Sequence, residues 1–111
     1  HAGLSLSGVF DLRPLMATPH NDELKLNAVD AAIASPLFWP VPRRLAFDCW
    51  VGADESFEFL RQSRSLAAAC TGLGLAAPYA IEPGENHFSV ARVLADPASA
   101  VTKRLAELAQ G

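Results

Sequence analysis

Three short apolar runs along the chain are each followed by a segment whose apolar residues recur at helical spacing. We predict strands at residues 4–9, 45–51 and 76–81, because apolar runs of about four to eight residues bounded by turn residues are typical of buried strands. Helices are predicted at residues 22–34, 57–71 and 97–109, where apolar residues gather on one helical face. The elements therefore follow the order strand–helix, three times over.

This alternation is typical of a parallel α/β sheet with right-handed crossovers. The run at residues 45–51 is apolar on both faces, as expected of a strand covered by helices on both sides. Three strands are few for such a sheet, and the first would be left as an unprotected edge. We therefore expect the second half of a doubly wound sheet.

Composition narrows the functional classes. The chain has 111 residues, about one domain, of which 50% are hydrophobic and 19% charged, so a disordered tail is excluded. The formal net charge is −3 and the Lys and Arg residues form no basic run, which argues against nucleic-acid binding. No apolar stretch reaches the ~18–20 residues of a membrane span. We expect a soluble, cytoplasmic protein that binds neither nucleic acid nor membrane.

The start of the chain and its two cysteines lead to two further expectations. The chain opens at His1 without an initiator Met or a signal peptide, and we expect it to be a piece of something longer. Cys49 and Cys70 both lie in apolar runs, so we interpret them as buried thiols, with a disulfide or a metal role as the alternative. Nothing in the sequence indicates a metal site or an organic cofactor.

Candidate chemistry gathers where the predicted strands end. Asp11, Asp54 and His87 follow the first, second and third strand, and such loops meet at one edge of a parallel sheet. Asp54 and His87 follow adjacent strands, so a hydrogen bond between them would fix the imidazole tautomer. Taken singly, each has a structural alternative: Asp54 as a turn former and His87 as a solvated loop residue. Asp11 with Arg13 is interpreted as a turn and salt bridge.

Several segments, in order and over nearly the whole chain, resemble the serine α/β-hydrolases, and most closely the esterase branch that includes kynurenine formamidase (arylformamidase). These segments are LSGVFDLRPL (6–15), NDELKL (21–26), SP (35–36), GADES (52–56), EFLRQS (58–63) and GENHF (84–88). Phe57 departs from the pattern, since relatives often have proline there. The resemblance makes the expected fold class α/β: the C-terminal part of a doubly wound, mostly parallel α/β-hydrolase sheet, with about three strands alternating with three helices over residues 1–111.

The resemblance implies that Asp54 is the acid and His87 the base of a catalytic triad that hydrolyses a small-molecule ester or aryl formamide. The G-x-S-x-G nucleophile motif and the oxyanion loop are absent from the chain. The serine would then come from a missing N-terminal half or a second chain, and these residues alone would be inactive. Trp39 and Phe88 are candidate substrate-binding aromatics, although both could simply pack their loops.

Two other functions remain open. The chain could be a non-catalytic, hydrolase-derived module that pairs its open sheet edge with another chain, including a homo-oligomer. It could also be an independent small α/β ligand-binding domain, which would make the placement of Asp54 and His87 a coincidence. The position of the first strand, central or at the edge, separates these hypotheses.

Overall fold

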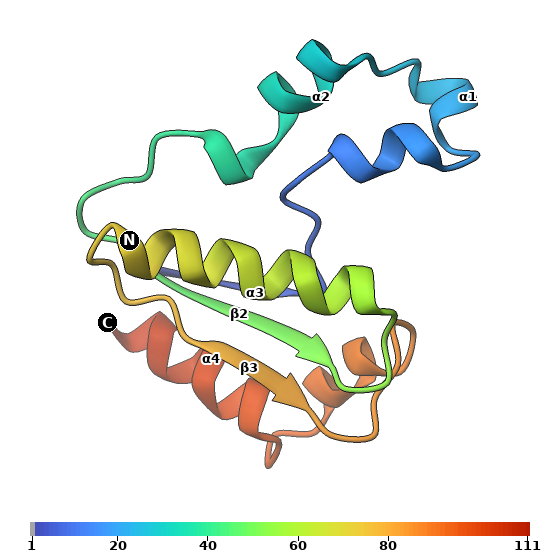
Figure 1. The fold of residues 1–111 in the computed structure, drawn as a ribbon. Helices are drawn as coiled ribbons and strands as arrows, with labels where there is room; N and C mark the ends of the chain where they lie inside the picture. The colour runs from blue at the N-terminus through green and yellow to red at the C-terminus, as the bar shows by residue number, and fades with distance from the viewer. Residues whose placement is uncertain (1) are drawn as a thin grey trace.

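The computed structural model describes residues 2–111 and is built on a three-stranded parallel sheet (Figure 1). The strands are β1 (Ala2–Leu6), β2 (Ala46–Gly52) and β3 (Tyr79–Glu82), in the order β1-β2-β3. Cys49 of β2 lies opposite Ser5 on one side and Tyr79 on the other. Within the described residues β1 is therefore an edge strand, as the sequence predicts.

One long helix covers each face of the sheet. Helix α3 (Phe57–Gly72) packs on β2, and helix α4 (Ala100–Gln110) lies on the opposite side of the strands (Figure 1). Successive side chains of β2 point alternately toward α3 and toward α4, because neighbouring residues of a strand face opposite sides of the sheet. Cys49 faces α3, whereas Asp48 accepts hydrogen bonds from Arg104 of α4 at 2.7 and 3.1 Å.

The hydrophobic core lies between α3 and the sheet. Its buried members are Phe10, Cys49, Leu66, Ala67, Cys70 and Ala77. Leu66 and Cys70 are four residues apart on α3, so they share the face turned to the strands. Both cysteines are buried and free, which confirms their interpretation as core thiols. Burial is the main cause that raises the pKa of the Cys49 thiol to about 12.

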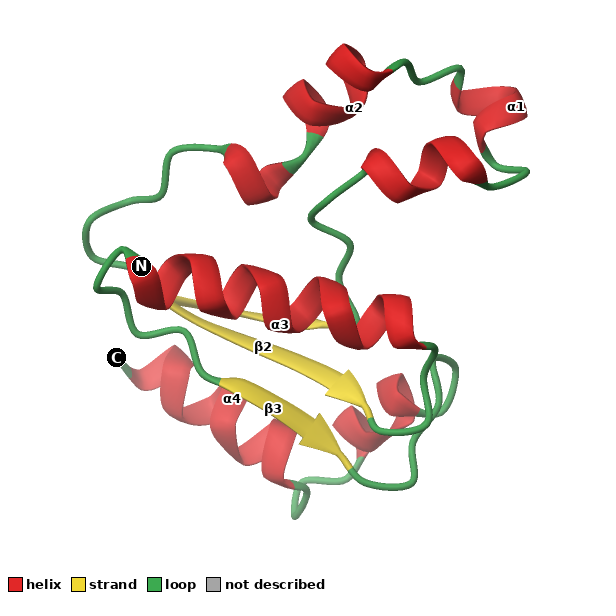
Figure 2. Ribbon diagram, in the orientation of Figure 1, coloured by secondary structure: helices red, strands yellow, loops and turns green. Residues whose placement is uncertain are grey.

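The connection from β1 to β2 consists of short helical turns and loops (Figure 2). It contains η1 (Arg13–Ala17), α1 (Asn21–Leu24), α2 (Ala28–Ala34) and η2 (Pro36–Phe38), where η denotes a 3-10 helix. The prediction of a single helix over residues 22–34 is therefore wrong. Lys25 adopts a left-handed conformation with φ 52°, and Asn27 caps a new helix by accepting a hydrogen bond from the Asp30 N–H.

The remaining elements differ from prediction mainly at their ends. β1 stops at Leu6, because Ser7 takes a positive φ of 56° and turns the chain away. β3 begins at Tyr79, and Ala76 makes only an isolated bridge to Ala46. The last helix starts at Ala100, after the short η3 (Val90–Ala95), because Ser99 caps it. No helix within residues 2–111 is long and apolar enough to cross a membrane.

The predicted pattern of one helix after each strand is also incorrect. Four helical segments separate β1 from β2, and only α3 is a long helix between two strands. The strand order follows the sequence without a reversal among the described residues. A doubly wound sheet reverses its strand order at a switch point, next to which its ligands bind. The described sheet contains no such switch point.

Candidate functional site

The candidate site lies where β2 and β3 end, at one edge of the sheet (Figure 1). Glu55 follows β2 and His87 follows β3. Their side chains meet, with His87 Nδ1 2.7 Å from Glu55 Oε1. This distance is a hydrogen bond between a base and a carboxylate, the arrangement that orients a catalytic imidazole.

Glu55 is held in place from two other points of the chain. Its side chain is fully buried, and its Oε2 accepts hydrogen bonds from the Gly52 N–H (2.6 Å) and the Ser7 hydroxyl (2.5 Å). Ser7 follows β1, Gly52 ends β2 and His87 follows β3, so all three strand ends converge on one carboxylate. A buried carboxylate is tolerated when hydrogen-bond donors satisfy its oxygens.

Gly52 is required by the close approach of the two loops. A Cβ atom at this position would lie 2.3 Å from the Glu85 carbonyl oxygen and 3.1 Å from Glu55 Oε2. The loops are tied together by backbone hydrogen bonds, from the Ala53 N–H to the Glu82 oxygen and from the Asp54 N–H to the Glu85 oxygen, both 2.9 Å. The backbone thus fixes the spacing between Glu55 and His87.

The imidazole of His87 contacts two aromatic rings and remains partly exposed to solvent. Phe59 of α3 stacks on it with ring centroids 4.2 Å apart, and Phe88 meets it edge-on at 5.7 Å. The His87 side chain is 44% exposed, and its Nε2 makes no hydrogen bond with the described residues. A cavity of about 400 Å³ lies over the pair, and Ser56 and Asn86 also line it. A substrate could therefore reach Nε2.

The structure does not pair the predicted acid, Asp54, with His87. Asp54 is exposed and lines the same cavity, and the carboxylate within hydrogen-bond distance of His87 Nδ1 is that of its neighbour Glu55. Glu55 was not among the predicted site residues. α3 begins only at Phe57 with Ser56 as its cap, so Glu55 precedes the helix and its side chain folds back onto the Gly52 N–H. The sequence feature that could have identified Glu55 is its position three residues after Gly52, the glycine that ends β2.

The two candidate aromatics lie in different places. Phe88 lines the cavity of His87, as expected of a substrate-binding residue, and is 82% exposed. Trp39 lines a separate cavity beside Phe10 and Pro36, and its indole N–H donates to the Ile33 oxygen at 2.8 Å. The structure thus brings Phe88, and not Trp39, to the candidate site.

Asp11 has a structural role. It forms a two-point salt bridge with Arg13, at 2.9 Å for both contacts, and a longer one with Arg61 of α3 at 3.4 Å. The predicted turn and salt bridge are therefore present. The hydrogen bond from the Arg13 guanidinium is the main cause that lowers the pKa of this buried carboxyl to about 2, against the opposing effect of burial.

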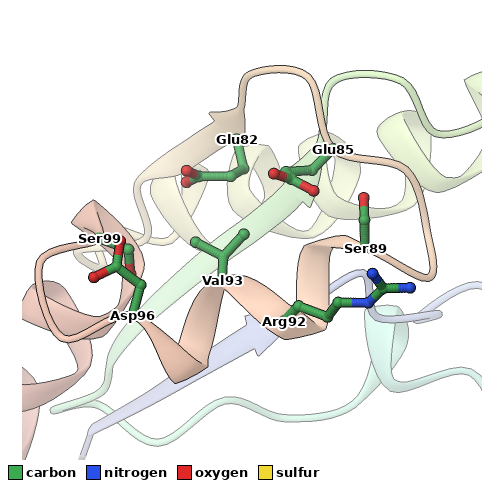
Figure 3. A pocket seen from close by; sticks show the side chains of 7 residues that line it. All are labelled: Glu82, Glu85, Ser89, Arg92, Val93, Asp96 and Ser99. Atoms are coloured by element: carbon green, nitrogen blue, oxygen red, sulfur yellow. The ribbon is translucent and has the colours of Figure 1, made fainter.

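A second depression, of about 500 Å³, lies between the end of β3 and the segment that leads into α4 (Figure 3). Its lining includes the carboxylates of Glu82, Glu85 and Asp96 together with Arg92. His87 is not among its lining residues. Nowhere in residues 2–111 do three His, Cys, Asp or Glu side chains come together as ligands for a metal ion.

The chain is similar to a protein of known structure. No protein-family model and no curated protein matches the chain. Among solved structures, it is similar to the crystal structure of a "putative thioesterase" from Silicibacter sp. TM1040, with a TM-score of 0.83 and 31% sequence identity over 93% of this chain. The present chain spans 37% of the length of that protein.

This match and the strand order overturn the predicted fold class. The described residues form a small α/β unit with a three-stranded parallel sheet, similar to part of the thioesterase structure. They do not form the C-terminal part of a doubly wound, mostly parallel α/β-hydrolase sheet. The physical reason is that short helical turns and loops join β1 to β2, in place of the single crossover helix that the sequence predicts.

Proposed function

We propose that this chain contributes the base and its orienting carboxylate to a hydrolase that cleaves an acyl compound. His87 is the base and Glu55 the carboxylate. The observation that carries the proposal is the 2.7 Å contact between His87 Nδ1 and the fully buried Glu55, with Nε2 left open to a cavity. The similarity to a thioesterase supports a hydrolase in general terms.

The mechanism follows from the two nitrogens of the ring. Because the ionised Glu55 only accepts hydrogen bonds, it selects the tautomer with the proton on Nδ1, and the lone pair on Nε2 is then free. Nε2 removes the proton from a hydroxyl nucleophile as its oxygen bonds to the acyl carbon. The imidazolium returns that proton to the leaving group when the bond to the acyl carbon breaks. Water, activated by the same nitrogen, then releases the acid.

The nucleophile in this proposal is a serine hydroxyl supplied by a second chain or by residues other than those described. Among residues 2–111 no serine hydroxyl is hydrogen-bonded to His87. A water molecule activated directly by Nε2 is the alternative. Labelling with a fluorophosphonate separates the two, because the reagent attaches covalently to an activated serine and not to water.

The candidate substrates are carboxylic esters, thioesters and aryl formamides. The thioester comes from the structural match, and the other two from the sequence resemblance to esterases and kynurenine formamidase. All three have an acyl carbon that a base-activated hydroxyl attacks, so one site can in principle serve each.

The test is a comparison of three variants on p-nitrophenyl acetate, an acetyl thioester and formanilide. His87→Ala and Glu55→Gln should each lower kcat by about 10²–10⁴ on whichever substrate the protein cleaves. The matched control is Asp54→Asn, one residue away, which should stay within about twofold of the wild type. Equal losses in Asp54→Asn and Glu55→Gln would contradict the assignment of the carboxylate, and full activity in His87→Ala would contradict the function itself.

A second readout does not depend on activity. At a pH where the imidazole is neutral, long-range proton–nitrogen NMR spectra should show the His87 proton on Nδ1 in the wild type and in Asp54→Asn. This preference should be lost in Glu55→Ala. A ring protonated on Nε2 in the wild type would rule out the proposed base.

A further inference from the structure

An apolar cavity of about 220 Å³ lies beside the candidate site and shares Phe59 with the cavity over His87. Its apolar wall is formed by Val9, Pro14 and Leu15 from the segment after β1, and by Phe59 from α3. Neither the mechanism above nor the sequence analysis makes use of this cavity.

Two features connect the cavity to His87. Phe59 lines both cavities and stacks on the imidazole with ring centroids 4.2 Å apart, so the two cavities share this side chain. Val9 is two residues from Ser7, whose hydroxyl donates to Glu55. The walls of the cavity are thus continuous with the residues that position the base.

The cavity is also lined by four polar residues, Thr18, His20, Glu58 and Gln62, and three of them form side-chain hydrogen bonds within the protein. The Gln62 side chain accepts from the Phe10 and Asp11 N–H groups and donates to the Asp11 oxygen and to Glu58. Glu58 also forms a salt bridge with Arg61 at 2.7 Å. The Thr18 hydroxyl donates to the Leu15 oxygen at 2.8 Å. An apolar occupant would therefore leave no polar group of these three residues without a partner.

The size of the cavity fits one compact apolar group. An apolar protein cavity of about 150 Å³ binds benzene, so about 220 Å³ accommodates a phenyl ring or a short alkyl chain.

We infer that this cavity is the binding site for a phenyl or short alkyl group of the substrate, and that Val9, Leu15 and Phe59 determine which substrates are accepted. The inference rests on the proposed function, because it places the reacting acyl carbon at His87. Burial of the apolar group would be favourable, since removing apolar surface from water stabilises the complex. The preferred substrates would then be phenylacetyl or hexanoyl compounds, in place of acetyl ones.

The test fills the cavity without touching His87 or Glu55. Leu15→Trp should lower the ratio of kcat/KM for p-nitrophenyl phenylacetate to that for p-nitrophenyl acetate by about tenfold or more. The matched control is Ala17→Trp, which adds the same side chain at an exposed position of η1 that does not line the cavity. An unchanged ratio in Leu15→Trp, with the fold intact by circular dichroism, would overturn the inference.

A binding measurement separates this inference from the proposed function. Benzyl alcohol is the probe. It should shift the methyl NMR signals of Val9 and Leu15 in the wild type and equally in His87→Ala, and it should leave those of Val9 unshifted in Leu15→Trp. If His87→Ala abolishes hydrolysis and the probe leaves these methyl signals unchanged, the cavity inference fails alone. If His87→Ala remains active, the proposed function fails and the inference, which depends on it, is overturned with it.

Discussion

At the scale of single residues, the site depends on where one carboxylate is buried. Asp54 and Glu55 are neighbours in the chain, yet Asp54 is exposed and the Glu55 side chain is completely buried. Both oxygens of Glu55 have partners: His87 on one, and Ser7 with Gly52 on the other. The carboxylate therefore joins three segments that are far apart in the sequence.

Gly52 gives the first prediction at this scale. Gly52→Ala should destabilise the protein by about 1–3 kcal/mol, because its Cβ would overlap the Glu85 carbonyl and force the two loops apart. Displacement of Glu55 should also lower activity. The free energy of unfolding in urea measures the first effect. Gly72→Ala is the control, since nothing lies within 4 Å of its Cβ. Equal stability of the two variants would show that the loops tolerate the methyl group.

His87 lies after β3, at the strand end where the sequence predicts it, and the carboxylate that it contacts is one residue away from the predicted Asp54. Strand ends can be located from apolar runs, so His87 was expected at the carboxyl edge of the sheet. The choice between Asp54 and Glu55 depends on the direction of each side chain in a turn of four residues, 53–56. Both residues suit a loop, and only the packed loops decide which carboxylate is buried.

At the scale of elements, the segment after β1 is attached to α3 by polar contacts. The Gln62 side chain bonds to the backbone of Phe10 and Asp11, and Arg61 reaches the Asp11 carboxylate. These contacts cross 50 or more residues of sequence. They hold the wall of the apolar cavity against the helix that carries Phe59.

Asp11 makes the pH dependence of this attachment testable. Its folded-state pKa is about 2, below the ordinary value of 3.8, chiefly because of the Arg13 hydrogen bond. A lowered pKa stabilises the fold at pH values above about 4, and that contribution is lost as the pH falls through about 2. Asp11→Asn should therefore cost about 2 kcal/mol at pH 7 and very little near pH 2.

The measurement is the free energy of unfolding of both proteins in urea between pH 7 and pH 2. The difference between wild type and Asp11→Asn should shrink steadily below pH 4. A difference that stays constant with pH would mean that the ionised carboxylate is not what links the segment to α3.

The elements also show where periodicity fails. The apolar residues of 22–34 have helical spacing, but Ile33 and Val29 are mostly exposed and the helix is broken at residues 25–27. The pattern in this region was accidental, because few of these side chains reach the core. In contrast, α3 was predicted to within one residue, since Leu66 and Cys70 do pack on the sheet.

At the scale of the whole molecule, three parallel strands are covered by α3 and α4, and both cysteines lie in the resulting core. Arg104 adds a polar link across the far face by binding the buried Asp48 of β2. The fold class assumed from the sequence resemblance was wrong, because the resemblance concerns short segments and the sheet order is a property of how they assemble.

The reactivity of the two cysteine thiols shows whether α3 stays packed on the sheet. Burial raises the pKa of Cys49 to about 12 and also raises that of Cys70, so little thiolate is present in the folded protein at pH 8. Neither thiol should react with Ellman's reagent over minutes in the native state, and both should react in 6 M guanidinium chloride. Rapid reaction of one thiol before unfolding would show that the contact between α3 and the sheet opens locally.

The sequence by itself determined the elements whose apolar side chains face the core, the burial of the two cysteines and the position of His87 at the end of a strand. These follow from local periodicity and from the shared direction of parallel strands. Only the tertiary structure decided that Glu55 is the partner of His87, that Trp39 lies apart from the site, and that Phe59 lines two cavities. Each of these depends on contacts between segments distant in sequence, and such contacts form only when the loops and helices pack together.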